Sequence, residues 1–245
     1  MARVGRVTAI NFSPVLTDNE AHLGRIVTAI KAQKRNKDRV SIYLDGEYAF
    51  GLARIVAAWL HVGQELSEEK ITQLTAQDEV EAAYARSLRL LSQRDHTTTE
   101  IRQNLKRHEL AEPVIDDVIG RLERAGLIND ERFAQNWIEN RSEFRPRSRR
   151  ALAFELRARG VAPEAFEEAL GQTDEEEMAY RAGRKQSSKY QQLLWPEYRQ
   201  KMIAFLARRG FSYGISAPVV QRIWQEKQAE SDPRNATTEY EEVNS

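Results

Sequence analysis

A cluster of arginines near the middle of the chain is its strongest candidate for chemistry, and that chemistry is the binding of anions. Arg145, Arg147, Arg149 and Arg150 follow one another closely. A guanidinium presents several N–H donors in a planar fork that matches the oxygens of a carboxylate or a phosphate. The cluster lies where a helix is expected to begin, and the helix dipole disfavours positive charge there. An anionic partner would offset this cost; the alternative is a solvated arginine-rich turn.

Further basic residues are expected on the helices that follow the cluster. Some of them end predicted helices, where the dipole favours cations in any case, and others, with Arg199, extend along a predicted helix surface. Helix-end stabilisation and ordinary solvation are the alternatives to a binding role. The candidate residues for binding a partner or DNA are Arg145, Arg147, Arg149, Arg150, Arg157, Arg159, Lys185, Lys189, Lys201, Arg208 and Arg209.

Charge is balanced overall but is unevenly distributed along the chain. The 37 Lys and Arg residues equal the 37 Asp and Glu residues, whereas a typical nucleic-acid-binding domain is strongly basic. Residues 141–159 nevertheless hold seven arginines against two glutamates, and residues 181–209 hold eight basic residues against Glu197 alone. Acidic residues gather at 164–177 and near the C-terminus. This segregation favours a basic face presented to an acidic partner.

The sequence offers little support for catalysis or metal binding. It contains no cysteine, which excludes disulfides, cysteine-ligated metals and thiol nucleophiles, and suits a reducing compartment. The four histidines, at 22, 61, 96 and 108, lack metal-ligand spacing, and Asp174–Glu177 is interpreted as the start of a helix. Walker, GxGxxG and GxSxG motifs do not occur. We therefore expect no enzyme activity, catalytic residue, metal or cofactor; an enzyme whose triad is hidden by sequence spacing is the alternative.

Membrane insertion and export are not predicted. No apolar run approaches the roughly 18 residues that cross a bilayer, and Met1–Gly24 has no continuous apolar run of the kind found in secretory signals. No heptad seam predicts a coiled coil. We expect a cytoplasmic monomer that does not bind membranes.

Residues 25–51 show the alternation of a small antiparallel β-meander. Val40, Ile42 and Leu44 alternate with more polar neighbours, and Asp45-Gly46 is a strong signal for a two-residue hairpin turn. A small sheet needs a cover for its apolar face. Predicted helices over 52–60 and 67–76, the second capped by Ser67, supply that cover.

The remaining chain contains an internal repeat with a period of 50 to 51 residues. Ile101, Leu152 and Met202 correspond, as do Leu105, Leu156 and Leu206, and then Leu110, Val161 and Phe211. Each copy has an i, i+4 apolar pair, a tight turn and a second such pair, which predicts two helices joined at a corner. A further helix precedes each pair. The aromatic residues assigned to repeat cores are Phe133, Trp137, Phe154, Phe166 and Phe211; Trp59 and Trp224 are assigned to packing, and Trp195 to packing or contact.

The expected fold is mainly α: three tandem three-helix, helix-turn-helix-like repeats in an elongated array, preceded by a small antiparallel β-meander with helices. Such an array suits docking along a filament better than enclosing a catalytic pocket. The predicted divisions are 1–24 flexible N-terminal arm, 25–76 meander plus helices, 77–128 repeat 1, 129–173 repeat 2, 174–226 repeat 3 and 227–245 disordered tail.

Several of these segments resemble the RecX family of regulatory proteins. The stretch 90–105 (LLSQRDHTTTEIRQNL) is similar to the family's opening repeat, and 126–138 (GLINDERFAQNWI) to its Gly-hydrophobic-hydrophobic-x-Asp-x-x-Phe-Ala motif. The signatures at 155–160 and 206–211 are similar to its second and third repeats, so the resemblance covers 80–226. Ser148 stands in a turn where the family often has glycine. The meander resembles the extra domain of longer members.

The resemblance implies a cytoplasmic modulator of the RecA recombinase, acting in DNA repair, homologous recombination and the SOS response. It implies docking in the groove of the RecA–single-stranded DNA filament and modulation, in the direction of inhibition, of ATP hydrolysis, filament growth and strand exchange. The residues alone leave another hypothesis open, a direct DNA-binding protein that uses its basic second and third repeats. Salt dependence distinguishes the two, because binding to DNA phosphates weakens steeply as salt rises.

Overall fold

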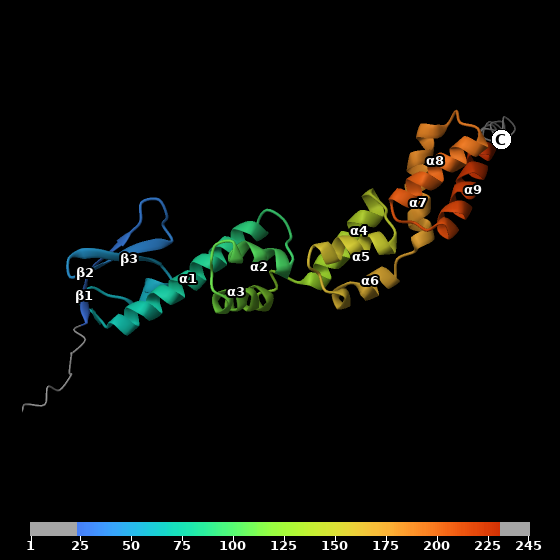
Figure 1. The fold of residues 1–245 in the computed structure, drawn as a ribbon. Coiled ribbons are helices and arrows are strands. Elements are labelled where there is room, and N and C mark those ends of the chain that lie inside the picture. The colour runs from blue at the N-terminus through green and yellow to red at the C-terminus, as the bar shows by residue number, and fades with distance from the viewer. Residues whose placement is uncertain (1–23, 231–245) are drawn as a thin grey trace, which may run out of the picture. The chain divides into compact units, whose positions relative to one another are not determined.

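The computed structural model describes residues 24–230, which form two compact units divided between Glu81 and Ala82 (Figure 1). The arm predicted for 1–24, apart from Gly24, and the tail from residue 231 onwards lie outside the described residues.

The first unit is built on a four-stranded antiparallel sheet in the order β3-β2-β1-β4. Asp45 and Gly46 both have positive φ, 52° and 90°, as the predicted hairpin turn requires. The short fourth strand was not expected; it pairs with the start of the first. The strands are β1 Arg25–Ala32, β2 Arg39–Leu44, β3 Glu47–Ala53 and β4 Glu65–Leu66.

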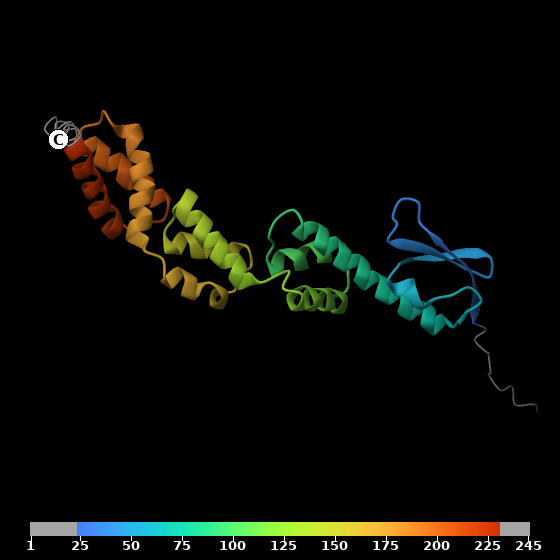
Figure 2. The ribbon, with the colours of Figure 1, turned by 180° about the vertical axis from the view of Figure 1, so that it is seen from behind.

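The helix α1, Glu68–Leu91, covers the apolar face of this sheet with its first turns (Figure 2). Ser67 caps it as predicted, because its Oγ accepts a 3.2 Å hydrogen bond from the Lys70 N–H. The helix runs on without a break into the first repeat, so the expected boundary at residue 76 lies inside it. The helix predicted over 52–60 is wrong: β3 continues through Ala53, and only the 3₁₀ turn η1, Val56–Trp59, follows.

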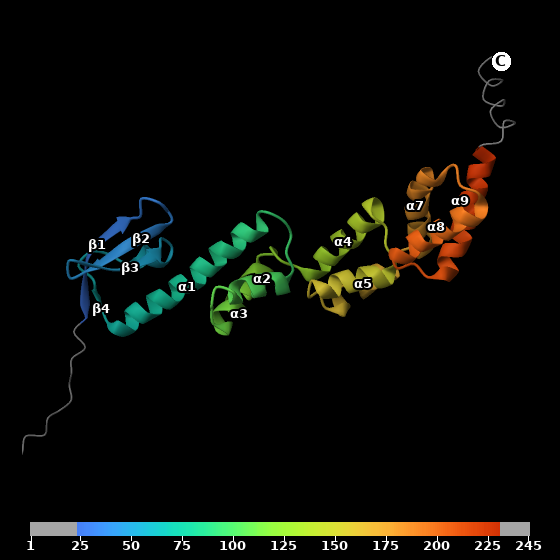
Figure 3. The same ribbon diagram turned by 45° about the horizontal axis from the view of Figure 1, so that its top comes forward.

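The second unit contains the three predicted three-helix repeats (Figure 3). The first repeat combines the end of α1 with α2 and α3, the second contains α4 to α6, and the third contains α7 to α9. Their bounds are α2 Thr98–Lys106, α3 Glu112–Arg124, α4 Asp130–Phe144, α5 Arg149–Ala158, η2 Pro163–Ala165, α6 Glu167–Gly171, α7 Glu175–Ser187, η3 Ser188–Tyr190, α8 Trp195–Arg208 and α9 Tyr213–Glu230.

Of the nine residues that define the repeat register, eight are buried as predicted and Leu110 is half-buried. The six corresponding residues on the middle helices, Ile101, Leu105, Leu152, Leu156, Met202 and Leu206, are all 0 % exposed. Acidic Asp174 caps α7 by accepting a hydrogen bond from the Glu177 N–H, so the acidic run does open a helix. The periodicity therefore identified both the helices and their inward faces.

Two aromatic assignments and one boundary differ from the prediction. Phe154 is 72 % exposed, because Leu152 and Leu156 fix the buried side of α5 and a residue midway between them points away from it. Trp59 is 89 % exposed rather than packed. The predicted tail begins too early, since α9 continues through Glu230 and Lys227 Nζ donates a 2.7 Å hydrogen bond to the Gln191 carbonyl.

Candidate polyanion-binding track

The link between α4 and α5 brings predicted basic residues to the third repeat. Arg145 ends α4, Pro146 is buried, and Ser148 caps α5 by accepting a 3.1 Å hydrogen bond from the Ala151 N–H. A hollow of about 850 Å³ lies between this link and the helices α7 and α8. Its lining residues are Phe144, Arg145, Pro146, Arg147, Ala182, Lys185, Gln186, Ser188, Lys189, Phe205, Arg208 and Arg209.

This hollow collects six of the eleven basic residues singled out from the sequence. They come from the α4–α5 link, from the last turn of α7 with η3, and from the end of α8. No carboxylate from residues 24–230 lines the hollow. Among the described residues, none forms an ion pair with Arg145, Lys185, Lys189 or Arg208, whereas Glu155 Oε1 lies 3.0 Å from Arg147 Nε. The hollow is thus strongly cationic and mostly unneutralised.

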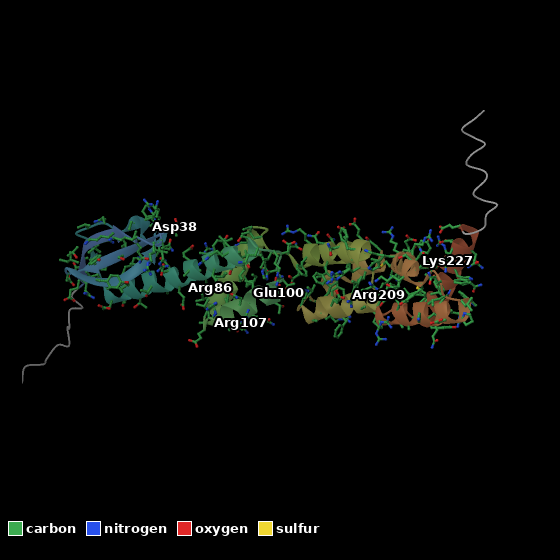
Figure 4. The ribbon with its side chains drawn as sticks, turned by 90° about the horizontal axis from the view of Figure 1, so that it is seen from above. Asp38, Arg86, Glu100, Arg107, Arg209 and Lys227 are labelled. Carbon is green, nitrogen blue, oxygen red and sulfur yellow. The ribbon has the colours of Figure 1, made fainter. Side chains whose placement is uncertain are left out.

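Arg209 lines the hollow and links the third repeat to the second (Figure 4). Its guanidinium donates a 3.1 Å hydrogen bond to the Pro146 carbonyl and lies 4.6 Å from the centre of the Phe205 ring. Its own carbonyl accepts a 3.1 Å hydrogen bond from the Ser148 N–H. The side chain is therefore fixed before any ligand arrives.

The basic side chains in the hollow act on one another. Burial lowers the pKa of Arg209, and the like charges of Arg147 and Arg145 lower it further. Arginine stays protonated in proteins even so, which means that the groups remain charged and repel one another. An anion placed among them would be attracted by all three guanidinium groups.

A second hollow on the third repeat shares lining residues with the first. It has a volume of about 390 Å³ and shares Ser188 and Lys189 with the larger one. Lys201 lines it, although Glu197 pairs with this lysine at 2.8 Å. We call the two neighbouring hollows together the basic track; their cations are Arg145, Arg147, Lys185, Lys189, Lys201, Arg208 and Arg209.

Four predicted basic residues lie outside the basic track. Arg149 Nε donates a 3.1 Å hydrogen bond to the Thr173 carbonyl, and Arg150 is exposed on the first turn of α5. The Arg157 guanidinium lies 5.6 Å from the centre of the Phe166 ring. Arg159 pairs with Glu100 at 2.8 Å and lies 4.2 Å from the centre of the Trp137 ring, so it joins the first two repeats.

Three aromatic side chains of the track were not singled out from the sequence. Phe144, 59 % exposed, and the half-buried Phe205 line the larger hollow, and the half-buried Tyr190 lines the smaller one. The available signal for Phe144 was its place beside Arg145 and off the buried stripe of its helix. One exposed and two half-buried aromatic side chains therefore lie among the cations of the track.

A separate groove on the second repeat carries the opposite charge. Its volume is about 520 Å³, and it lies between α4 and the η2–α6 segment. The carboxylates that line it belong to Glu131, Glu139, Glu164 and Glu168, and within the described part of the chain no Lys or Arg lines it. The charge segregation predicted from the sequence is therefore present on the surface of the second and third repeats.

The described part of the chain shows no grouping of three or more His, Asp or Glu residues that could hold a metal ion. Within the same residues, no helix is both long enough and apolar enough to cross a membrane.

Together, the fold and the track define a tandem three-helix-repeat protein with a cationic surface built across its second and third repeats. Four family models match the chain: the regulatory protein RecX N-terminal domain at 25–67, and the first, second and third three-helix domains of RecX at 83–122, 129–170 and 174–220. The chain belongs to the RecX family of regulatory proteins.

Curated relatives and solved structures agree with this assignment. The regulatory protein RecX of Bacillus subtilis (strain 168) is 31% identical over 211 residues, which cover 84% of this chain and 80% of that protein. The RecX of Amycolatopsis mediterranei is 36% identical over 145 residues, covering 58% and 83%. A crystal structure of regulatory protein RecX is similar with a TM-score of 0.64 and 28% identity, covering 82% of this chain and 99% of that one. RecX from Lactobacillus salivarius shares the fold, with a TM-score of 0.54 and 22% identity over 60% and 97% of the two chains.

Proposed function

We propose that this protein regulates RecA by docking onto the RecA–single-stranded DNA filament in the cytoplasm. Docking inhibits the RecA ATPase, filament growth and strand exchange, and so regulates DNA repair and recombination. The observation that carries the proposal is the basic track, in which two repeats present cations that the described chain leaves largely unneutralised. Membership of a family of regulatory proteins supports a role through binding rather than catalysis.

The basic track is suited to a filament because a filament offers a repeated negative surface. Positive residues held in place by their own protein lose little freedom on binding, which favours affinity. Arg209 is fixed by the Pro146 carbonyl and Phe205, and Arg147 by Glu155. Lys185, Lys189 and Arg208 are exposed and supply the adaptable contacts.

A stand-alone DNA-binding protein with helix-turn-helix-like repeats is the second candidate function. The basic track favours it, since a protein that binds DNA without RecA needs a cationic surface. The formal net charge of zero counts against it.

The test is the single-stranded-DNA-dependent ATPase rate of RecA, titrated with this protein at physiological salt. We expect the rate to fall when there is well below one protein per RecA, because a bound regulator that blocks filament growth acts on many subunits. An unchanged ATPase rate together with tight binding to naked DNA would favour the stand-alone DNA-binding function instead.

A matched pair of variants ties the test to the basic track. Arg208 and Arg124 are both exposed arginines in the last turn of a helix, but only Arg208 lines the track. Arg208→Glu combined with Lys189→Glu is expected to require at least about ten times more protein for the same inhibition, because loss of two charge contacts costs about 1.4 kcal/mol or more. Arg124→Glu is expected to inhibit like the unmodified protein.

A further inference from the structure

We propose that the acidic tail, residues 231–245, binds the basic track of its own chain, so that a partner must displace the tail before it can use the track. The inference rests on the proposed function, because it concerns the regulation of the same surface. The tail lies outside the described residues. The grounds are its sequence, the place where α9 ends and the charges of the track.

The tail carries the kind of charge that the track attracts. Asp232, Glu239, Glu241 and Glu242 supply four carboxylates against the single guanidinium of Arg234. Three of these carboxylates fall within four consecutive positions. A carboxylate accepts N–H hydrogen bonds from lysine and arginine much as a phosphate does. The chain therefore contains an anionic segment of its own that can compete for the track.

The helix α9 ends at the level of the track. It runs in the same direction as α7, because Tyr180 Oη donates a 2.7 Å hydrogen bond to Glu226 and Arg184, one turn later, pairs with Glu230. Beyond Arg184 the chain of α7 passes into η3 and reaches Lys189, which lines both hollows. The tail thus starts beside the segment that carries Lys189.

Lys227 holds this end of α9 against the smaller hollow (Figure 4). Its Nζ donates a 2.7 Å hydrogen bond to the carbonyl of Gln191, and Gln191 lines that hollow. Glu239 comes nine positions after Glu230, and an extended chain of that length reaches about 30 Å. The acidic positions of the tail can therefore reach the cations of the track while α9 stays in place.

The carboxylates nearest to the tail have partners of their own and leave the track open. Glu226 pairs with Arg222, and Glu230 pairs with Arg184. The exposed cations of the track that form no ion pair with any of residues 24–230 are Arg145, Lys185, Lys189 and Arg208. Like charges gathered in one hollow repel one another, and an anion placed among them removes part of that repulsion.

The covalent connection makes a weak contact effective. A segment on a short linker meets its site at an effective concentration of about a millimolar. A tail that fills the track in about two of every three molecules weakens the binding of any other anion about threefold. A partner with many charges displaces the tail, whereas a short anionic peptide does not. The tail therefore reserves the track for strongly charged partners.

The contact is tested on the full chain by zero-length carbodiimide cross-linking, which joins a lysine to a carboxylate that touches it, followed by peptide mass spectrometry. Lys106 and Glu112, 2.6 Å apart on the first repeat, are the internal control. An added thymidine oligonucleotide is expected to remove the tail links and to leave the control link. The expected links join Glu239, Glu241 or Glu242 to Lys185, Lys189 or Lys201.

An equal mixture of unlabelled and isotope-labelled protein identifies the owner of the tail. We expect both ends of each tail link to carry the same label, because the tail binds its own chain. Links of mixed label would assign the track to the tail of a second copy and overturn the proposal. The absence of any tail link in a sample that shows the control link would overturn it too.

Neutralising the tail is the second test, read by fluorescence anisotropy of the labelled thymidine oligonucleotide. Glu239→Gln, Glu241→Gln and Glu242→Gln together are expected to tighten binding by at least about threefold at low salt, because the competitor is lost. The gain should shrink as salt screens the contact.

A second triple variant is the control for net charge. Glu139→Gln, Glu164→Gln and Glu168→Gln remove as many carboxylates from the acidic groove, which lies outside the track. We expect these changes to leave the affinity nearly unaltered. Equal gains from the two triple variants would show that only the total charge matters, and the tail contact would be refuted.

The RecA ATPase assay keeps the two proposals apart, since the cross-links form without RecA or DNA. If the tail links form but the protein never inhibits RecA, the proposed function fails and the inference stands. If the protein inhibits RecA, but no tail link forms and tail neutralisation leaves the inhibition unchanged, the inference fails and the proposed function stands.

Discussion

The Thr97 hydroxyl donates a 2.8 Å hydrogen bond to the carbonyl of Arg159, at the end of the equivalent helix one repeat further along the chain. The same oxygen accepts a 3.1 Å hydrogen bond from the Glu100 N–H and so caps α2. One repeat later, Ser148 caps α5 and its N–H bonds the Arg209 carbonyl at the end of α8. Thr97 and Ser148 are both fully buried. In both joints, the residue that caps the start of the middle helix in one repeat is therefore hydrogen-bonded to the end of the equivalent helix in the next repeat.

Thr97→Val tests the first of these joints. The substitution keeps the shape of the side chain but removes both the cap of α2 and the donor to the Arg159 carbonyl. We expect the free energy of unfolding, measured by urea denaturation with circular dichroism, to fall by about 1–3 kcal/mol.

Thr98→Val is the control for this joint. Thr98 is half-buried, and its backbone N–H donates a 2.9 Å hydrogen bond to the Asp130 carboxylate. The substitution leaves this backbone donor in place. We expect a change below about 0.5 kcal/mol. A Thr97→Val protein as stable as the control would show that the joint contributes nothing to stability.

Gly210→Ala tests the second joint. Gly210 has a φ of +92°, and a Cβ there would overlap Ser148 Oγ and lie 2.9 Å from Ala151 Cβ. Gly126 also has a positive φ, +66°, but a Cβ there would meet nothing. We expect Gly126→Ala to cost about 1 kcal/mol of unfolding free energy for the backbone conformation alone, and Gly210→Ala about 2–4 kcal/mol because the clash is added.

In the first repeat, Glu109 stands at the position that corresponds to Gly210. It has a φ of +59° and is exposed. A left-handed conformation can therefore be held without glycine where space allows. If Gly126→Ala and Gly210→Ala lose the same unfolding free energy in thermal and urea unfolding, then Ser148 can move away from the added Cβ without a measurable loss of stability.

The repeat register could be predicted from the sequence because it depends on local periodicity. Leu152 and Leu156 are spaced to share one face of a helix, and burial of that face gives the pair its place in the core. The same reasoning placed the Asp45-Gly46 turn and the cap at Ser67, which are set by residues close in sequence.

The basic track could be predicted only in part. The arginines were visible as a cluster, but sequence distance does not show that Arg145 and Arg208 line one hollow or that Arg159 turns away to Glu100. That sorting depends on how one repeat packs on the next, through contacts such as Ser148 with Arg209. Phe144 was missed for the same reason, because its role depends on neighbours that are remote in sequence.

Glu100 gives the junction between the first two repeats a dependence on pH. Burial alone would raise the pKa of its carboxyl, but the hydrogen bond from Arg94, with the charges of Arg94, Arg159 and His96, holds that pKa below its ordinary value of 4.5. A folded-state pKa below the unfolded value means that the carboxylate stabilises the protein above about pH 4.5. This contribution is lost as the pH falls through the lower, folded-state pKa.

Glu100→Gln is therefore expected to lower the free energy of unfolding by about 1–3 kcal/mol at pH 7, because Arg94 and Arg159 lose their charged partner. Urea denaturation at a series of pH values should show the difference from the unmodified protein shrinking as the solution becomes more acidic than pH 4.5. Glu139→Gln, at an exposed residue of the acidic groove, is expected to change stability little at any pH. If the unfolding free energies of Glu100→Gln and the unmodified protein still differ by the same amount at pH 2–3, the loss would come from altered packing or hydrogen bonding and not from the missing charge.

Leu156→Ala tests the repeat register itself. Leu156 is 0 % exposed in the core shared by the second and third repeats, so its truncation leaves a cavity among well-packed neighbours. We expect urea denaturation to show a loss of about 2–5 kcal/mol. Phe154→Ala, two residues earlier on the exposed side of the same helix, removes a larger side chain but should cost less than about 1 kcal/mol. The difference between the two variants depends only on which side of α5 faces the core. A larger loss for Phe154→Ala than for Leu156→Ala would mean that Phe154, and not Leu156, faces the core.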